Sequence, residues 1–216
     1  MSMDLNNQLK LIGLRLAVPS SPNRAGAEGA IDIEATLLNA MALFQRDARL
    51  ASLIFSWVKV HGSYVIVEKL RKLAASAPPE ATPWLPALAA LAVEDGSHKW
   101  RKLLHRLDQP LMLFPAALTR SAVARNGVTG WLERWNIIVP QGALRIRERD
   151  VLSPPELIAL NRQYRNRYLY GPNWRADIIT AIESGAGTPS QVMRLVGCSY
   201  EPAHRIFTEY HLARTA

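Results

Sequence analysis

Residues 188–210 decide how the C-terminal part of the chain folds, and they read TPSQVMRLVGCSYEPAHRIFTEY. Thr188 followed by Pro189 is a typical helix start, because threonine caps the free amide groups of the first turn and proline fits that turn. Gly197 comes where a tight turn would need a positive φ. Ser199 can then cap a second helix. The stretch is therefore expected to form two short helices joined by a tight turn.

Apolar residues recur at helical spacing on both sides of Gly197, which predicts the inward face of each helix. A preceding helix over residues 174–184 has an apolar stripe of its own, so three helices can share one small core. The residues expected to point inward are Val192, Leu195, Val196, Ala203, Ile206, Phe207 and Tyr210, with Trp174, Ile178, Ala181 and Ile182 from the preceding helix.

This stretch resembles the helix-turn-helix cores of bacterial transcriptional regulators. It departs from their common pattern at Met193, where a small residue is usual, and at Cys198, where a branched aliphatic residue is usual. The resemblance implies that the second helix enters the major groove of double-stranded DNA and that a homodimer binds two half-sites. The residues expected to contact DNA are Gln191, Arg194, Ser199, Tyr200, Glu201, His204, Arg205 and Thr208.

Further arginines lie just before this stretch. Arg162, Arg165 and Arg167 are interspersed with tyrosines, and Arg175 belongs to the preceding helix. Arginine binds phosphate bidentately and tyrosine can pack against sugars, so these four arginines are expected to hold the DNA backbone. The alternative is a solvated helix face with tyrosines in the core. Tyrosines that stack on bases would instead indicate binding of single-stranded RNA, which is the less favoured interpretation.

The charge of the chain is distributed unevenly. Residues 1–100 contain ten Lys/Arg and nine Asp/Glu, whereas residues 101–216 contain sixteen and nine. Fifteen of those sixteen basic residues are arginine. A basic half beside a neutral half indicates that one part of the protein meets a polyanion while the other has a different role. A merely basic surface is the alternative.

The first half is expected to be helical. Residues 31–44, 47–62 and 63–73 have apolar residues at three- and four-residue steps, with Asp47 and Ser63 as caps. Four prolines in residues 77–86 interrupt this run of helices. Further expected elements are a short strand near residues 9–16 and helices over residues 97–107, 116–125 and 128–135.

Residues 137–146 predict a β-hairpin, because two apolar runs flank a turn at residues 140–142. Helices followed by a hairpin are the order of winged-helix domains, so residues 128–149 could form a recognition helix and a wing. Otherwise the hairpin packs on the bundle. The expected fold class is mainly α, a helical bundle with one β-hairpin and a C-terminal three-helix module.

The chain is accordingly expected to have four parts. The last begins at Ser153, where Ser-Pro-Pro-Glu predicts a helix that runs to Tyr168. The favoured function is a sequence-specific DNA-binding regulator. The alternative is a helical adaptor or antitoxin-like protein that binds a partner protein. The expected parts are an arm and linker (1–30), a helical dimerisation or partner-binding domain (31–110), helices with the hairpin (111–152) and the DNA-binding domain (153–216).

Several classes of protein are not expected. The longest apolar runs fall short of the roughly 20 residues that cross a bilayer, so a cytoplasmic protein without a membrane partner is predicted. Cys198 is the single cysteine, and no Cys/His spacing fits zinc. Neither a glycine-rich phosphate loop nor a nucleophile motif is present. We therefore expect no enzyme, no metal and no cofactor.

Overall fold

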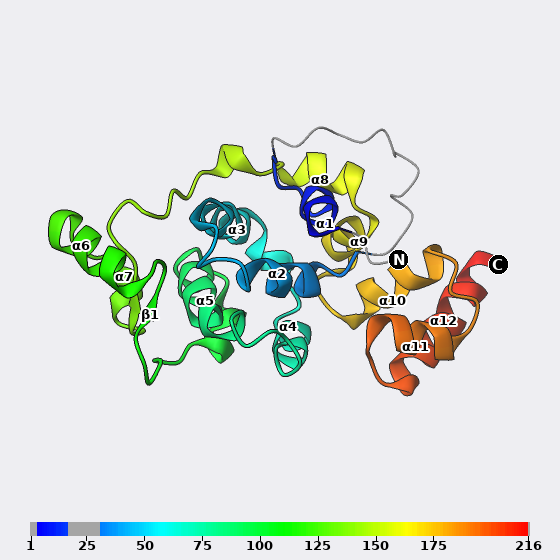
Figure 1. Cartoon of the computed structure of the whole chain (residues 1–216). Coiled ribbons are helices and arrows are strands. Elements are labelled where there is room, and N and C mark those ends of the chain that lie inside the picture. Colours follow the sequence, from blue (N-terminus) through cyan, green and yellow to red (C-terminus); the bar gives the residue numbers. More distant parts are fainter. Residues whose placement is uncertain (1–3, 17–30, 216) are drawn as a thin grey trace. The chain divides into compact units, whose positions relative to one another are not determined.

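The structure, a computed structural model, describes residues 4–16 and 31–215 and is built mainly of helices (Figure 1). The chain divides into two compact units. The described part of the first unit is residues 4–16 and 32–153, and that of the second is Ile31 with residues 154–215. Residues 1–3 and 17–30 of the predicted arm and linker lie outside the described residues. None of the described helices is long and apolar enough to cross a membrane.

Seven α-helices make up most of the described part of the first unit. They are α1 Leu5–Leu11, α2 Ile33–Met41, α3 Ala48–His61, α4 Val67–Ala74, α5 Leu85–Glu94, α6 Ala116–Asn126 and α7 Gly130–Glu133. Short 3-10 turns lie at Gly62–Tyr64, Thr82–Trp84, His98–Leu103 and Glu148–Asp150.

Helix α3 runs through the core of the first unit. Its predicted cap is confirmed, because Asp47 Oδ1 accepts a hydrogen bond from the Leu50 amide at 2.9 Å. The predicted apolar stripe is buried, and so are Ser52 and Ser56 on other faces. Leu37 and Leu38 in α2 are buried as predicted too. A helix buried on nearly every side must satisfy its polar side chains within the protein.

Three local predictions in the first unit are wrong. The short strand expected near residues 9–16 is reduced to an isolated bridge at Leu14, because α1 takes up residues 9–11 and brings Leu9 and Ile12, both buried, to one face. Ser63 caps no helix; it lies in a 3-10 turn, and α4 begins at Val67 after two buried residues. The helix expected over residues 97–107 is the 3-10 turn His98–Leu103.

The predicted β-hairpin is also wrong. Strand β2, Ile137–Ile138, pairs in parallel with β1, Leu111–Met112, rather than with the residues that follow it. The turn itself forms, since the Ala143 amide donates to the Pro140 carbonyl at 3.1 Å, but the two arms then separate.

Buried serines of α3 explain why the arms separate. The Arg145 amide donates to Ser52 Oγ at 3.1 Å, and the Arg147 amide donates to Ser56 Oγ at 2.9 Å. The backbone amides of the second arm thus bind α3 instead of a neighbouring strand. Because residues 137–146 form no hairpin, the prediction of a wing is wrong as well. The helix expected over residues 128–135 is only the four-residue α7.

The second unit is formed by five consecutive helices (Figure 1). The single helix expected over residues 153–168 is divided at Asn161, whose side chain accepts a hydrogen bond from the Tyr164 amide at 2.9 Å and so starts a new helix. The five helices are α8 Pro154–Leu160, α9 Arg162–Tyr170, α10 Trp174–Glu183, α11 Pro189–Val196 and α12 Tyr200–Thr215.

We predict that His61 makes the first unit less stable in acid. Burial lowers the pKa of His61 from 6.5 to about 4, although the hydrogen bond between Nε2 and the Leu152 carbonyl opposes the shift. The unfolded chain therefore takes up a proton below pH 6.5 that the folded unit accepts only near pH 4. The free energy of unfolding should fall by about 3 kcal/mol between these values.

Urea unfolding measured from pH 7 to pH 4 tests this prediction. His61→Gln keeps a donor for the Leu152 carbonyl but cannot titrate, so its stability should fall less steeply over the same pH range. Equal slopes for the two proteins would contradict the role given to His61.

Candidate nucleic-acid interface

Helices α11 and α12 are joined by the tight turn that the sequence predicts. Thr188 Oγ1 accepts a hydrogen bond from the Gln191 amide at 3.2 Å and caps α11. At the other end Gly197 has a φ of 75°, and its amide donates to the Met193 carbonyl at 2.9 Å. This left-handed conformation favours glycine, and it allows the chain to reverse before α12 begins at Tyr200.

One apolar cluster holds α10, α11 and α12 together. Val192 and Val196 of α11 meet Ala203 and Ile206 of α12, and all four are buried. Met193, Cys198, Phe207 and Tyr210 are partly buried against this cluster, together with Trp174. The expected inward position of Leu195 is wrong, because this side chain is 66% exposed. The inward face of α11 is thus narrower than its sequence suggests.

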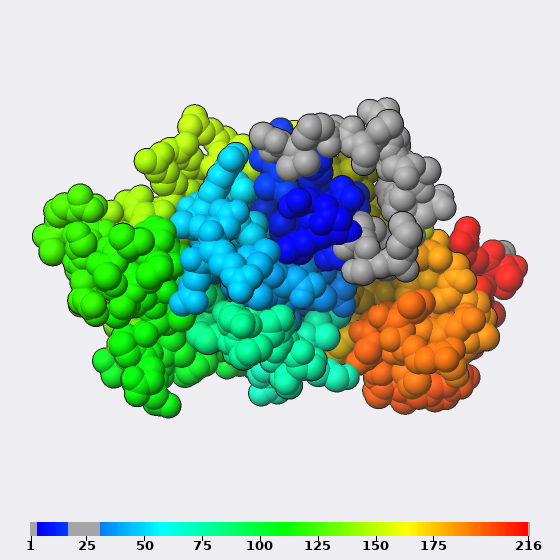
Figure 2. All heavy atoms as spheres, in the orientation of Figure 1, coloured from blue at the N-terminus to red at the C-terminus, as the bar shows by residue number. Residues whose placement is uncertain are grey.

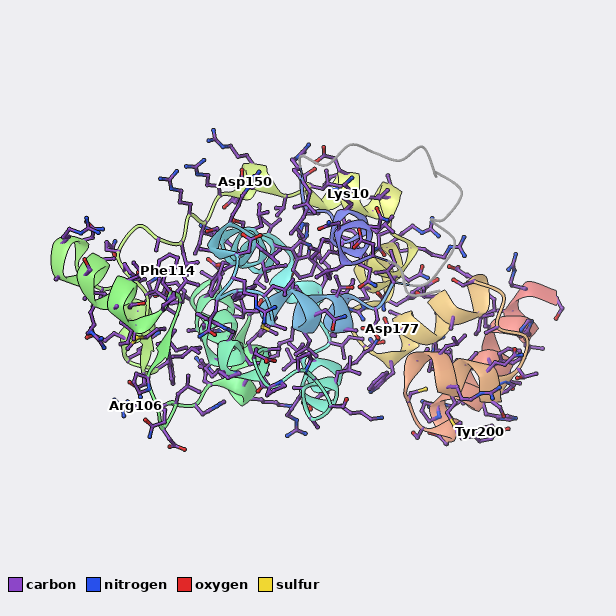
Figure 3. All side chains as sticks on the ribbon, in the orientation of Figure 1. Lys10, Arg106, Phe114, Asp150, Asp177 and Tyr200 are labelled. Carbon is purple, nitrogen blue, oxygen red and sulfur yellow. The ribbon has the colours of Figure 1, made fainter. Side chains whose placement is uncertain are left out.

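The predicted contact residues of α11 and α12 all lie at the surface of the second unit. The atoms of α11 form part of the face drawn in Figure 2, in the darker orange, and Figure 3 marks Tyr200 at the start of α12. The exposed residues of this outer face are Gln191, Arg194, Ser199, Tyr200, Glu201, His204, Arg205 and Thr208.

Some side chains of the outer face interact with one another. The Arg205 Nε and Glu201 Oε1 atoms are 3.7 Å apart, and both side chains are exposed, so this ion pair is weak and can exchange for a ligand. The rings of Tyr200 and His204 lie 5.7 Å apart. Arg194 forms no ion pair with any described residue. Its guanidinium group can therefore meet an external anion without first breaking an internal pair.

The four arginines expected to bind phosphate have different surroundings. Arg162 Nη1 donates to the Glu183 carbonyl at 2.7 Å, near the end of α10. Arg165 Nη2 lies 3.8 Å from Glu183 Oε2, and Arg175 Nη1 lies 3.0 Å from Glu209 Oε2. Arg165 and Arg175 remain about half exposed, so both can still reach a ligand.

The expectation for Arg167 is wrong. Its side chain is completely buried, with Nε 2.8 Å from Asp177 Oδ1 and Nη2 2.8 Å from Asp177 Oδ2. Gln163 Nε2 donates to the same carboxylate at 3.1 Å. A guanidinium group held bidentately inside the protein cannot bind a phosphate. The sequence did contain one signal, since Asp177 lies between Ala176 and two isoleucines, where a carboxylate needs a buried partner.

The two units share the positive charge unequally. Residues 154–216 contain seven Lys/Arg and five Asp/Glu, whereas residues 101–153 contain nine and four. Most of the excess positive charge of residues 101–216 therefore lies in residues 101–153, which belong to the first unit. The outer face of α11 and α12 has little net charge, so binding by one copy would depend on specific contacts more than on long-range attraction.

Comparison of the chain with protein-family models, with curated proteins and with solved structures gives no significant match. Among the described residues, no three His, Cys, Asp or Glu side chains come close enough to hold a metal ion. The geometry of the two units is thus the basis for any functional proposal.

We predict that removal of either partner of the Arg167–Asp177 pair destabilises the second unit. Arg167→Met would leave the Asp177 carboxylate buried without its cation, which costs about 3–5 kcal/mol. Chemical denaturation of the full chain followed by far-UV circular dichroism, with wild type and variant compared, measures this loss. Arg165→Met removes an exposed partner and should cost less than about 1 kcal/mol. Similar losses for the two variants would contradict the structure.

We also predict that Gly197 is required for its backbone conformation rather than for space. Apart from its chain neighbours, no atom of the described residues lies within 4 Å of a Cβ added at this position, and φ is +75°. Gly197→Ala should therefore destabilise the second unit by about 1–2 kcal/mol through left-handed strain alone. Gly197→Asn should cost less, since asparagine tolerates this region. Equal stability of Gly197→Ala and the wild type in thermal unfolding would show that the turn has another conformation.

Proposed function

We propose that the second unit binds double-stranded DNA through α11 and α12 and that the chain is a transcriptional regulator with a helix-turn-helix. The main support for this proposal is the geometry of α11, Gly197 and α12. A short capped helix, a left-handed glycine and a longer helix share one apolar core, and the second helix leaves a polar face exposed. A protein of this kind would act in the cytoplasm.

The exposed residues are suited to reading a major groove. Arg205 can donate two hydrogen bonds to a guanine edge, and His204 can donate to or accept from a base. Ser199 and Thr208 have hydroxyl groups for phosphates or bases. Arg194 lies on α11, the helix that crosses the DNA backbone in such modules. We therefore assign base contacts to α12 and phosphate contacts to α11.

Homodimerisation is part of this proposal. The second unit has only a small positive excess, and a single module of this size reaches few base pairs. Two copies on half-sites one helical turn apart would supply the missing affinity, and residues 31–110 are the proposed dimerisation or partner-binding region. The exposed Arg165 and Arg175 would add phosphate contacts in each copy.

A second candidate function is binding of a partner protein by the same face. Leu195 is 66% exposed and Tyr200 is 50% exposed, and they flank the turn at Gly197. Apolar and aromatic side chains of this kind are typical of protein interfaces. An adaptor or antitoxin-like protein would use them, with no need for positive charge.

We predict that the chain selects a duplex sequence from a random pool and binds it with an affinity that falls steeply with salt. Arg205→Ala and His204→Ala should each cost about 1–3 kcal/mol on the selected duplex and relax its sequence preference. Arg194→Ala should weaken all duplexes alike and reduce the salt slope by about one. Fluorescence anisotropy over a salt series measures each effect.

Arg125→Ala is the matched control, because Arg125 is an exposed arginine of α6 in the first unit. It should leave the sequence preference unchanged. If the wild type binds no duplex even at low salt, the DNA proposal is wrong and the partner-protein function takes its place. Leu195→Ser would then be the variant to test for loss of a partner.

A further inference from the structure

A cavity of about 440 Å³ in the first unit is surrounded by arginine side chains. Arg15 follows α1, Arg49 lies in the first turn of α3, and Arg145 and Arg147 come from the segment that crosses α3. Among the described residues of the lining Asp150 is the single acidic one, so four positive charges face one negative charge there. In Figure 3, several side chains with nitrogen at their ends project outward around Asp150.

Three of these arginines have no counter-ion in the part of the chain that the structure describes. Arg49, Arg145 and Arg147 form no ion pair with any residue in the described ranges. The nearby carboxylate of Glu148 is directed to Lys59, whose Nζ lies 3.6 Å away. Like charges gathered around one cavity repel one another unless an anion enters it. The cluster is therefore suited to an external anion.

The backbone holds these arginines in place. The Arg145 and Arg147 amides donate to Ser52 and Ser56 of α3, at 3.1 and 2.9 Å. Residues two apart in an extended segment have their side chains on the same side, which explains why both line the cavity. The segment is therefore positioned before any ligand arrives.

Arg15 is placed by a second set of backbone contacts. Leu14 and Val151 form an antiparallel bridge, the Arg15 amide donates to the Asp150 carbonyl at 3.1 Å, and Arg15 Nε donates to the Val151 carbonyl at 3.3 Å. Segments far apart in the sequence are thus joined at the cavity. The arginines are therefore brought together by backbone contacts between several segments rather than by a single loop.

We propose that this cavity binds the phosphate or diphosphate group of a small molecule. Arginine binds phosphate oxygens bidentately, and several arginines from separate segments can surround a multiply charged group. A volume of about 440 Å³ lies in the range of small-molecule sites. The concave shape favours a small ligand over the continuous backbone of a nucleic acid. The proposal concerns the first unit and does not depend on DNA binding by the second.

The test is calorimetric titration of the full chain with inorganic pyrophosphate, at low and constant ionic strength, with sulfate for comparison. The wild type should bind one pyrophosphate, and saturation should raise the Tm of the first unit by about 5 °C. Each arginine should contribute roughly tenfold in affinity. Arg49→Gln should therefore bind about tenfold more weakly, and Arg145→Gln with Arg147→Gln about 100-fold more weakly.

Folding and total charge are controlled in this experiment. The Arg145→Gln, Arg147→Gln protein keeps both amides that bind Ser52 and Ser56, so its Tm without pyrophosphate should not fall. Arg120→Gln with Arg125→Gln removes the same charge from exposed positions of α6 and should bind pyrophosphate like the wild type.

Three outcomes would overturn the proposal. In the first, the wild type shows no heat of binding and no Tm shift at low ionic strength. In a second, the α6 control loses as much affinity as the cavity variant, which would reveal attraction to the overall charge. In a third, the wild type binds duplex DNA but not pyrophosphate, and the cavity variant no longer binds the DNA. The arginine cluster would then be a nucleic-acid surface.

Discussion

The buried pair of Arg167 and Asp177 is the interaction on which the second unit depends. The Asp177 carboxylate accepts two hydrogen bonds from Arg167 and one from Gln163, and Asn166 adds hydrogen bonds to Thr180 and Glu183, so buried polar contacts fix α9 to α10. The opposite side of α10 provides Ile178 and Ile182 to the cluster shared with α11 and α12. Because a buried charge tolerates little displacement from its partner, this pair sets the orientation of α10 and hence of the outer face.

Buried polar groups have a similar role in the first unit. Ser52 and Ser56 lie inside the core on α3 and accept the amides of Arg145 and Arg147. Each hydroxyl group also donates to a carbonyl four residues earlier in α3, so both serines are satisfied within the helix and can accept an amide as well. The two amide hydrogen bonds therefore replace the pairing of a hairpin and direct two arginines to the surface cavity.

The distribution of charge gives the two proposed sites different characters. The outer face of α11 and α12 combines a few polar groups with Leu195 and Tyr200, so it would discriminate by shape and hydrogen bonding. The cavity of the first unit is dominated by arginines and would recognise an anionic group by charge. Two sites of this kind on separate compact units would allow one chain to respond to a small anion and to bind a macromolecule.

The sequence by itself determined the features that depend on neighbouring residues. These are the caps at Asp47 and Thr188, the left-handed turn at Gly197 and most of the apolar stripes, because the interacting groups lie within about four positions along the chain. The exposed polar residues of α12 follow from the same periodicity. The mainly helical fold class could be predicted on this basis.

Tertiary structure alone decided the contacts between residues distant in the sequence. It withdrew Arg167 from the candidate site by pairing it with Asp177, and it paired β2 with β1 instead of with the next segment. It also brought Arg15 and Arg147 to one cavity. These partners depend on which buried donors and acceptors meet when the helices pack. The spacing of residues along the chain does not predict which ones meet.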